Sequence, residues 1–228
     1  WAGEIRRAGD HLLQMIEDLL DLARIEVGKM SIRLEELELG PVLAESLAIV
    51  QPMITSLGLR VDQDRCRTEG RRVLADRLRL RQVLVNLLSN AAKYNRPGGS
   101  ITLDCRLGAT GVRVSVTDTG AGMSADRLPK LFQPFERLGA ELGSVEGTGI
   151  GLALCRQLAD LMGATVGVES EVGVGSTFWI ELPHASGDAT QAQAAAPAPL
   201  AMPAVPFDVL YIEDNRSNTE VVAAFLAP

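Results

Sequence analysis

The sequence has few cysteines, no excess of positive charge and no long run of apolar residues. Its 228 residues include three cysteines, Cys66, Cys105 and Cys155, an odd number spread widely along the chain. This spacing predicts neither a disulfide framework nor a metal cluster, and it is typical of a reducing compartment. We therefore expect a cytoplasmic location for this segment, whether or not the parent protein is anchored in a membrane upstream.

Acidic residues outnumber basic ones, with 29 Asp and Glu against 22 Lys and Arg and a net charge of -7. Such a chain lacks the positive field that attracts nucleic acid or an anionic membrane surface, so we expect neither as a partner. No apolar run approaches the ~20 residues that a membrane-spanning helix needs. The chain opens on Trp1 rather than Met and shows no signal-peptide pattern, so we expect an internal fragment of a longer protein.

Residues 1–32 are the first of four segments along the chain, and residues 1–28 within it are predicted to form one long helix. Two interleaved apolar series repeat every seven positions, a pattern typical of a helical bundle or coiled coil, and Gly28 is a suitable stop signal. An ordinary amphipathic helix that lies on its own domain is the alternative. The two series are Ile5, Leu12 and Leu19, and Ala8, Met15 and Leu22.

Residues 33–184 combine helical apolar spacing with the alternation that is typical of half-buried strands. Because helices alternate with strands that are mostly linked as hairpins, we predict an α+β fold, a two-layer sandwich with helices on one face of a sheet. The helical stretches are 41–57, 76–94 and 148–163, and the strand-like stretches are 100–107, 112–117, 165–170 and 176–182.

The last two segments differ in composition from the rest. Residues 185–206 are rich in Ala, Pro and Gln, which cannot bury enough apolar surface to offset the entropy of ordering, so they predict a linker. Residues 207–228 resume an ordered pattern, with the apolar run FDVLYI followed by an acidic turn and a helical stretch. A single strand and helix of that length cannot fold alone, so we expect the start of another domain.

The predicted helix 76–94 has a polar stripe, Asn86, Asn90 and Lys93, opposite its apolar face. An amide oxygen can ligate Mg²⁺, and an ammonium one turn further on would meet the phosphates that the metal bridges. A solvated polar face is the alternative, although asparagine is a poor helix former.

A second candidate site begins where the strand 112–117 ends, with Asp118 followed by Gly120 and Gly122. A carboxylate only accepts hydrogen bonds, so it can bind the exocyclic amine of adenine, whereas guanine presents an acceptor there and would be repelled. The glycines allow a close backbone approach that a Cβ would block. An ordinary turn at a strand end is the alternative.

A glycine-rich stretch from Gly147 to Leu152 opens the predicted helix 148–163. The free N–H groups and positive dipole end of a helix N-terminus bind phosphate, although a loop that merely caps the helix is the alternative. The spacing fits neither a P-loop, because no Lys follows, nor a dinucleotide fingerprint. Before it, Phe132 and Phe135 open a long polar stretch, which predicts a lid that the aromatics pin when closed, or a short helix at the core edge.

The chain resembles the catalytic ATP-binding domain of sensor histidine kinases through five stretches that occur together and in order. They are NLLSNAAKY, DTGAG, FQPFER, GTGIGL and GVGSTFWIELP. These kinases belong to a wider superfamily with gyrase, heat-shock chaperone and mismatch-repair ATPases. The resemblance covers about residues 33–183 and implies a Bergerat-type α/β sandwich that holds ATP and Mg²⁺ between its helices and a mobile lid.

The resemblance also implies a role for each matching residue. Asn86 and Asn90 belong to the Mg²⁺-chelating box, with Asn90 as the direct ligand, while Lys93 contacts phosphate. Tyr94 lines the adenine pocket and Asp118 binds the adenine amine. The other matches are Gly120 and Gly122 in the adenine wall, Phe132 and Phe135 in the aromatic box, Gly147, Thr148, Gly149, Ile150, Gly151 and Leu152 beside the phosphates, and Thr177 near the adenine through water.

Both ends of the chain resemble further parts of these kinases. Residues 1–32 are similar to the second helix of the dimerisation and phosphoacceptor domain, which implies a homodimer through this helix. In the family the acceptor histidine sits on the preceding helix, and His11 does not replace it, because it lies on the wrong helix and is followed by two leucines. The stretch FDVLYIEDN resembles the first strand of a receiver domain, where Glu213 and Asp214 match an acidic pair that helps hold Mg²⁺.

We therefore predict the ATP-binding half of a hybrid sensor histidine kinase, with its own or a separate receiver domain or response regulator as partner. The intact enzyme would pass the γ-phosphoryl of Mg-ATP to a histidine and then to a receiver aspartate. One alternative is a conformational ATPase of the same superfamily, in which a transducer domain would take the place of the linker. The other is a non-catalytic dimerising scaffold.

Overall fold

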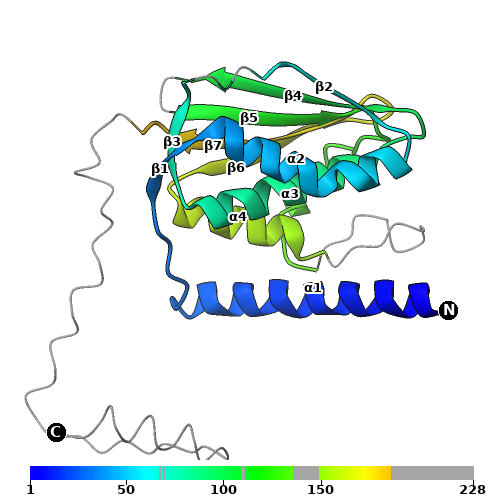
Figure 1. Ribbon diagram of the computed structural model, residues 1–228, viewed down its shortest axis with the longest axis horizontal. Helices are drawn as coiled ribbons and strands as arrows, with labels where there is room; N and C mark the ends of the chain where they lie inside the picture. Colours follow the sequence, from blue (N-terminus) through cyan, green and yellow to red (C-terminus); the bar gives the residue numbers. More distant parts are fainter. Residues whose placement is uncertain (67, 69, 109–110, 136–148, 186–228) are drawn as a thin grey trace, which may run out of the picture. The chain divides into compact units, whose positions relative to one another are not determined.

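A computed structural model of the chain describes residues 1–66, 68, 70–108, 111–135 and 149–185 (Figure 1). The predicted linker beyond Ala185 and the receiver-like segment 207–228 lie outside these residues, so both stay predictions. No helix in the described part of the chain is long and apolar enough to cross a membrane.

A five-stranded sheet forms the centre of the fold, with the strand order β2-β4-β5-β7-β6. Strands β2 and β4 are parallel, and the other neighbours are antiparallel. Strands β1 and β3 form a separate antiparallel pair. The bounds are β1 Glu35–Glu38, β2 Arg60–Arg65, β3 Arg72–Ala75, β4 Ser100–Leu107, β5 Gly111–Asp118, β6 Thr165–Glu171 and β7 Gly175–Pro183.

Helices α2 (Leu39–Ser56), α3 (Arg77–Lys93) and α4 (Gly151–Leu161) cover one face of this sheet (Figure 1). Leu84 and Leu88 of α3 are buried in one hydrophobic cluster with Leu103 of β4 and Val114 of β5. Full burial of each such side chain contributes roughly 1.5 to 3 kcal/mol. The predicted two-layer α+β fold is therefore confirmed. A short 3-10 helix, Leu128–Lys130, follows β5 in the chain.

Strands β1, β2 and β3 are absent from the sequence-based prediction. The sequence of β2, RVDQDR, is mostly charged and exposed, so it lacks the alternation that marks a half-buried strand. It joins the sheet at an edge, through main-chain pairing with β4. Such a strand depends on its partner rather than on its own side chains, and local patterning cannot reveal it.

Helix α1 (Ala2–Glu26) confirms the predicted N-terminal helix, and one of its faces packs on the rest of the domain. Leu22 is 5% exposed and belongs to the main hydrophobic cluster. The Asp21 carboxylate accepts hydrogen bonds from Arg79 at 2.9 Å and Gln82 at 3.2 Å, both on α3. Asp18 is also buried, and this burial raises its pKa. On this face, α1 is therefore an amphipathic helix that lies on its own domain, as the alternative interpretation of the sequence expected.

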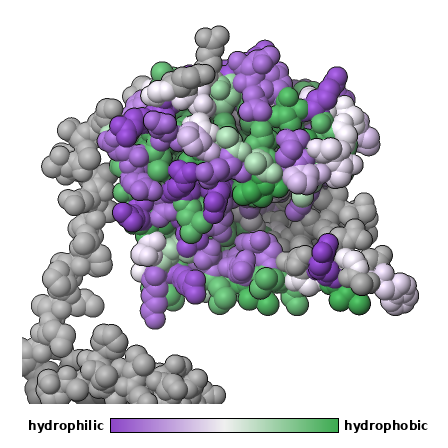
Figure 2. Space-filling model, in the orientation of Figure 1, coloured by the Kyte–Doolittle hydropathy of each residue, from purple (hydrophilic) through white to green (hydrophobic). Residues whose placement is uncertain are grey.

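The other face of α1 exposes a row of large apolar side chains, visible as green along the lower edge of Figure 2. It includes the whole first predicted heptad series, whereas Leu22 of the second series is buried against the domain. Such a continuous apolar stripe is typical of a surface that contacts another helix. The exposed residues are Ile5, Leu12, Leu13, Ile16, Leu19 and Leu20.

Cys66 and Cys105 form a disulfide with a sulfur–sulfur distance of 2.03 Å, so the expectation of unpaired cysteines is wrong. The parallel pairing of β2 with β4 places Arg65 opposite Asp104, so the next residues of both strands come together although 39 positions separate them. Spacing along the chain contains no information on this contact. The expectation of a reducing compartment rested on unpaired cysteines and loses that support.

Candidate functional site

The polar stripe of α3 lies at the C-terminal half of a helix whose start is well defined. The Asp76 side chain caps this helix by accepting a hydrogen bond from the Arg79 N–H at 3.1 Å. Asn86 and Asn90 are half-buried, and the Asn90 amide nitrogen donates to Asn86 Oδ1 at 2.8 Å. The Asn90 amide is therefore held in one orientation by its neighbour one turn earlier.

This orientation leaves Asn90 Oδ1 without a hydrogen-bond partner in the described part of the chain. A neutral amide oxygen that is held in place and unpaired is a suitable donor for a hard cation such as Mg²⁺. No group of three or more His, Cys, Asp or Glu residues that could hold a metal occurs among the described residues. The donor set therefore fits a cation that takes one amide oxygen and completes its shell with phosphate and water.

Asp118 is the last residue of β5 and is 4% exposed. Its Oδ1 accepts hydrogen bonds from the Gly120 N–H at 2.8 Å and the Ser176 N–H at 3.3 Å. Burial raises the pKa of this carboxyl, and the two backbone hydrogen bonds partly offset the rise. Oδ2 has no hydrogen-bond partner among the described residues, so it is the atom that can accept a hydrogen bond from a ligand.

The glycines after Asp118 are required by close backbone contacts. A Cβ at Gly120 would overlap the carbonyl oxygen of Tyr94, at the end of α3. A Cβ at Gly122, where φ is +66°, would overlap the carbonyl oxygen of Glu171 at the end of β6. The loop thus lies directly against α3 on one side and the β6–β7 hairpin on the other.

The start of α4 contacts the same helix α3. A Cβ at Gly151 would overlap the side-chain amide of Asn86, so the glycine lets the N-terminus of α4 touch the polar stripe. Gly149 has a φ of +70°, and its carbonyl oxygen accepts a hydrogen bond from the Phe135 N–H at 2.9 Å. Ile150 is buried and Leu152 packs against the core. The predicted phosphate contacts Gly147 and Thr148 lie outside the described residues.

The two aromatic residues before residue 136 differ in their packing. Phe132 packs against the hydrophobic core, with the Arg156 guanidinium 5.8 Å from its ring. Phe135 is 66% exposed and has a φ of +67°, which is unusual for a residue other than glycine. The predicted apolar latch requires both aromatic rings to pack against the domain, and of these two residues only Phe132 does so.

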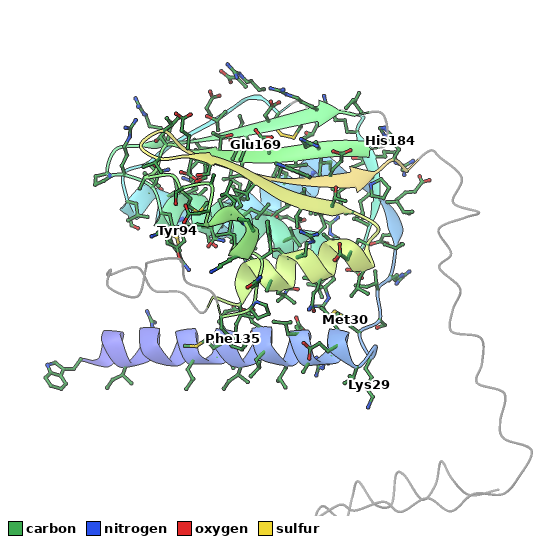
Figure 3. All side chains as sticks on the ribbon, turned by 180° about the vertical axis from the view of Figure 1, so that it is seen from behind. Lys29, Met30, Tyr94, Phe135, Glu169 and His184 are labelled. Atoms are coloured by element: carbon green, nitrogen blue, oxygen red, sulfur yellow. A yellow bond between two sulfur atoms is a disulfide. The ribbon has the colours of Figure 1, made fainter. Side chains whose placement is uncertain are left out.

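The remaining predicted residues lie at the same end of the sheet. Thr177 pairs with Thr117, next to the pairing of Asp118 with Ser176, and the two threonine hydroxyls are 2.9 Å apart. Lys93 and Tyr94 are exposed at the end of α3. Figure 3 shows Tyr94 and His184 at opposite ends of the domain, so His184 lies away from the end of α3.

Sequence reasoning missed two residues that join these parts. The Thr119 hydroxyl donates to Asn95 Oδ1 at 3.1 Å and accepts from the Ser100 N–H at 2.9 Å. The Asn95 amide nitrogen in turn donates to the Ser100 carbonyl at 3.0 Å. Asn95 directly follows the polar helix and Thr119 lies inside the glycine motif, and this adjacency was the one available signal.

Comparison with known proteins agrees with this geometry. Residues 75–186 match the family model described as histidine kinase-, DNA gyrase B-, and HSP90-like ATPase. The chain is also 30% identical to the solved catalytic domain of the histidine kinase ThkA, of which it covers 96%, with a TM-score of 0.57 over 67% of this chain. The chain belongs to this ATPase family. It contains the catalytic ATP-binding domain of a sensor histidine kinase.

Other relatives of this kinase domain are longer proteins. It is 31% identical over 232 residues to the autoinducer 2 sensor kinase/phosphatase LuxQ of Vibrio parahaemolyticus, a match with 97% of this chain and 27% of LuxQ. Full-length ShkA, solved in complex with AMPPNP, has a TM-score of 0.67 and 32% identity over 81% of this chain and 38% of ShkA. ThkA has also been solved in complex with the response regulator protein TrrA, with a TM-score of 0.60 and 25% identity over 80% of this chain and 49% of ThkA. The chain spans 38% of the length of a sensor-like histidine kinase of Rhizobium meliloti and 17% of the length of the virulence sensor protein BvgS of Bordetella bronchiseptica.

Proposed function

We propose that the kinase domain binds Mg-ATP where α3, the loop 118–123 and the start of α4 meet. The observation that supports this most directly is a pair of contacts on α3. Gly120 lies against the Tyr94 carbonyl at the end of α3, and Gly151 lies against the Asn86 side chain, so the adenine-binding and phosphate-binding motifs both adjoin the helix that has the polar stripe. Residues that are far apart in the sequence thus line one end of one helix.

In this proposal each group has one task. Asp118 Oδ2 accepts a hydrogen bond from the adenine amine, and Asn90 Oδ1 holds Mg²⁺, which supplies positive charge that neutralises the phosphates. The N–H groups in the first turn of α4, from Gly151 on, face the phosphates, and Lys93 adds a positive charge. Catalysis of phosphoryl transfer depends mainly on such positioning and charge neutralisation.

The whole parent protein is proposed to be a hybrid kinase with the four segments 1–32, 33–184, 185–206 and 207–228. The match to LuxQ includes almost the whole chain, and ThkA binds a response regulator, both of which support a receiver as the next phosphoryl acceptor. The exposed apolar face of α1 supports a homodimer through this helix. This chain would bind ATP but would not phosphorylate itself, since the acceptor histidine is expected on another helix. A domain that uses ATP works where ATP is abundant, so a cytoplasmic location stays part of the proposal.

Calorimetric titration of the chain with ATP, with and without Mg²⁺, tests this proposal together with the variant Asn90→Ala. The variant should lower the affinity for Mg-ATP by about tenfold, because one metal ligand is lost. Its affinity for ATP in EDTA should equal that of the wild-type chain, so the gain in affinity from Mg²⁺ should disappear.

The matched control is Gln51→Ala, which removes an exposed amide from α2, away from the proposed site. It should leave both affinities unchanged. A wild-type titration that stays flat with Mg²⁺ present would contradict the proposed function and support a scaffold. Rapid ATP hydrolysis by this chain alone would instead favour a conformational ATPase.

A further inference from the structure

The loop that begins at Asp118 is anchored at both ends on the β6–β7 hairpin. At its start, Asp118 Oδ1 accepts a hydrogen bond from the Ser176 N–H. At its end, the Met123 N–H donates to the Ser170 hydroxyl at 2.8 Å. The second anchor thus depends on one side chain, that of Ser170 at the end of β6.

The hydroxyl of Ser170 makes three hydrogen bonds, and its single proton determines their directions. The Gly175 carbonyl, at 3.1 Å, can only accept, so it takes this proton. The Met123 N–H can only donate, so it uses one lone pair of the hydroxyl oxygen. The Ser176 hydroxyl, at 2.9 Å, must therefore donate to Ser170. All the hydrogen-bonding capacity of Ser170 is used between the loop and the residues beside Asp118.

We propose that Ser170 is a positioning residue for adenine recognition, which it serves by holding the loop 118–123 on the hairpin. This inference rests on the proposed function, because it assigns the loop the task of presenting Asp118 to the base. Ser170 itself does not contact the base in this assignment. Its hydroxyl keeps the loop end in place, while its bond to Ser176 steadies the residue whose N–H binds the Asp118 carboxylate.

The middle of the loop contacts the hairpin through main-chain groups, and its Met123 end is held by the Ser170 side chain. The Gly122 backbone lies against the Glu171 carbonyl, and the Gly173 N–H donates to the Ala121 carbonyl at 2.7 Å. These main-chain contacts hold the middle of the loop, whereas the Ser170 hydroxyl holds its Met123 end. Removing the hydroxyl would leave the Met123 N–H, the Gly175 carbonyl and the Ser176 hydroxyl short of a partner.

Hydrogen exchange of the nucleotide-free chain tests the anchor directly, without any assumption about ATP. In Ser170→Ala the Met123 amide should exchange at least about tenfold faster, since it loses its acceptor. Ser170→Thr, which keeps the hydroxyl, should restore the wild-type rate. Ser115→Ala is the matched control, because Ser115 is also a half-buried serine of the sheet but is not part of this network.

Nucleotide titrations of the same variants test the consequence for recognition. Ser170→Ala should weaken ATP binding about tenfold and lower the preference for ATP over GTP, whereas a merely structural residue would weaken both nucleotides equally. Unchanged Met123 exchange, an unchanged ATP preference or failure of the threonine to rescue would overturn the inference. If the wild-type chain binds no nucleotide, the proposed function fails and the assignment to adenine recognition fails with it, whereas faster Met123 exchange would still establish the anchor.

Discussion

Replacing Asp118 with asparagine is expected to lower the affinity for ATP by about 100-fold or more without unfolding the domain. The amide keeps an oxygen that can accept from the Gly120 and Ser176 N–H groups, so the local fold is preserved. It places an N–H₂ donor where Oδ2 was, facing the amine of adenine, which is also a donor. A buried donor without a partner then opposes binding, and GTP should lose its disadvantage relative to ATP.

The pH dependence of ATP binding follows from the same carboxyl. Burial raises the pKa of Asp118 in the folded chain, so the acid form appears at a higher pH than in the unfolded chain. ATP affinity should therefore fall as the pH falls through this raised pKa. The free energy of unfolding depends on pH in the opposite direction to the affinity. The stabilisation from this carboxyl is full below its pKa in the unfolded chain and is lost as the pH rises through its pKa in the folded chain. Asp118→Asn should remove both dependences.

Isothermal calorimetry with ATP and GTP measures the affinities, and thermal unfolding checks that the variant is folded. Asp104→Asn is the matched control, because it neutralises another carboxylate of the same sheet that pairs with exposed Arg106. It should bind ATP as the wild type does. An Asp118→Asn variant that is folded and binds ATP with unchanged affinity would remove the basis of the proposed adenine site.

Reduction of the Cys66–Cys105 disulfide is expected to lower the free energy of unfolding by about 3 to 4 kcal/mol, since the bridge closes a long loop in the unfolded chain. In a domain of this size such a loss lowers the melting temperature by roughly 10 °C. ATP affinity should change little, because the bridge joins Cys66, just after the edge strand β2, to Cys105 of β4, which pairs with Val114 rather than with Asp118. The double variant Cys66→Ser/Cys105→Ser should match the reduced wild-type chain.

Thiol counting establishes whether the bridge is present in the purified protein. In denaturant, one thiol, that of Cys155, should react before reduction, and all three cysteines should react afterwards. In the folded chain Cys155 should stay unreactive, because burial raises its pKa and shields it from solvent. Three reactive thiols before reduction, or equal stability with and without reductant, would contradict the predicted contribution of the disulfide. Cys155→Ala provides the control for loss of a cysteine that is not bridged.

Much of the fold could be predicted from sequence because its helices and central strands bury alternate or helically spaced apolar residues. The helices α2, α3 and α4 and the strands β4 to β7 all have that pattern, and each lies within a few residues of its predicted range. The charged edge strand β2 does not, because main-chain pairing rather than side-chain burial places it in the sheet. The sequence predicted that α1 is a helix, but it did not predict which face of the helix packs against its own domain.

Some residues of the candidate site could likewise be predicted from the sequence and others could not. Asn90, Asp118 and Gly151 stood out because an amide on a helix, a carboxylate at a strand end and glycines before a helix each have a local chemical meaning. Thr119 and Ser170 did not, because a hydroxyl in a turn or strand has no such meaning until its partners are known. Their partners, Asn95 and Met123, lie 24 and 47 positions away.

The sequence by itself determined the order of the motifs, the type of most elements and the family to which the chain belongs, because these depend on residues close together along the chain. Only the tertiary structure decided that Cys66 meets Cys105, that Gly120 and Gly151 both adjoin α3, and that Ser170 anchors the loop of Asp118. Such contacts depend on strand order and loop path. Many different amino-acid sequences are compatible with the same strand order and the same course of a loop. Local sequence patterns therefore do not specify which distant residues come together.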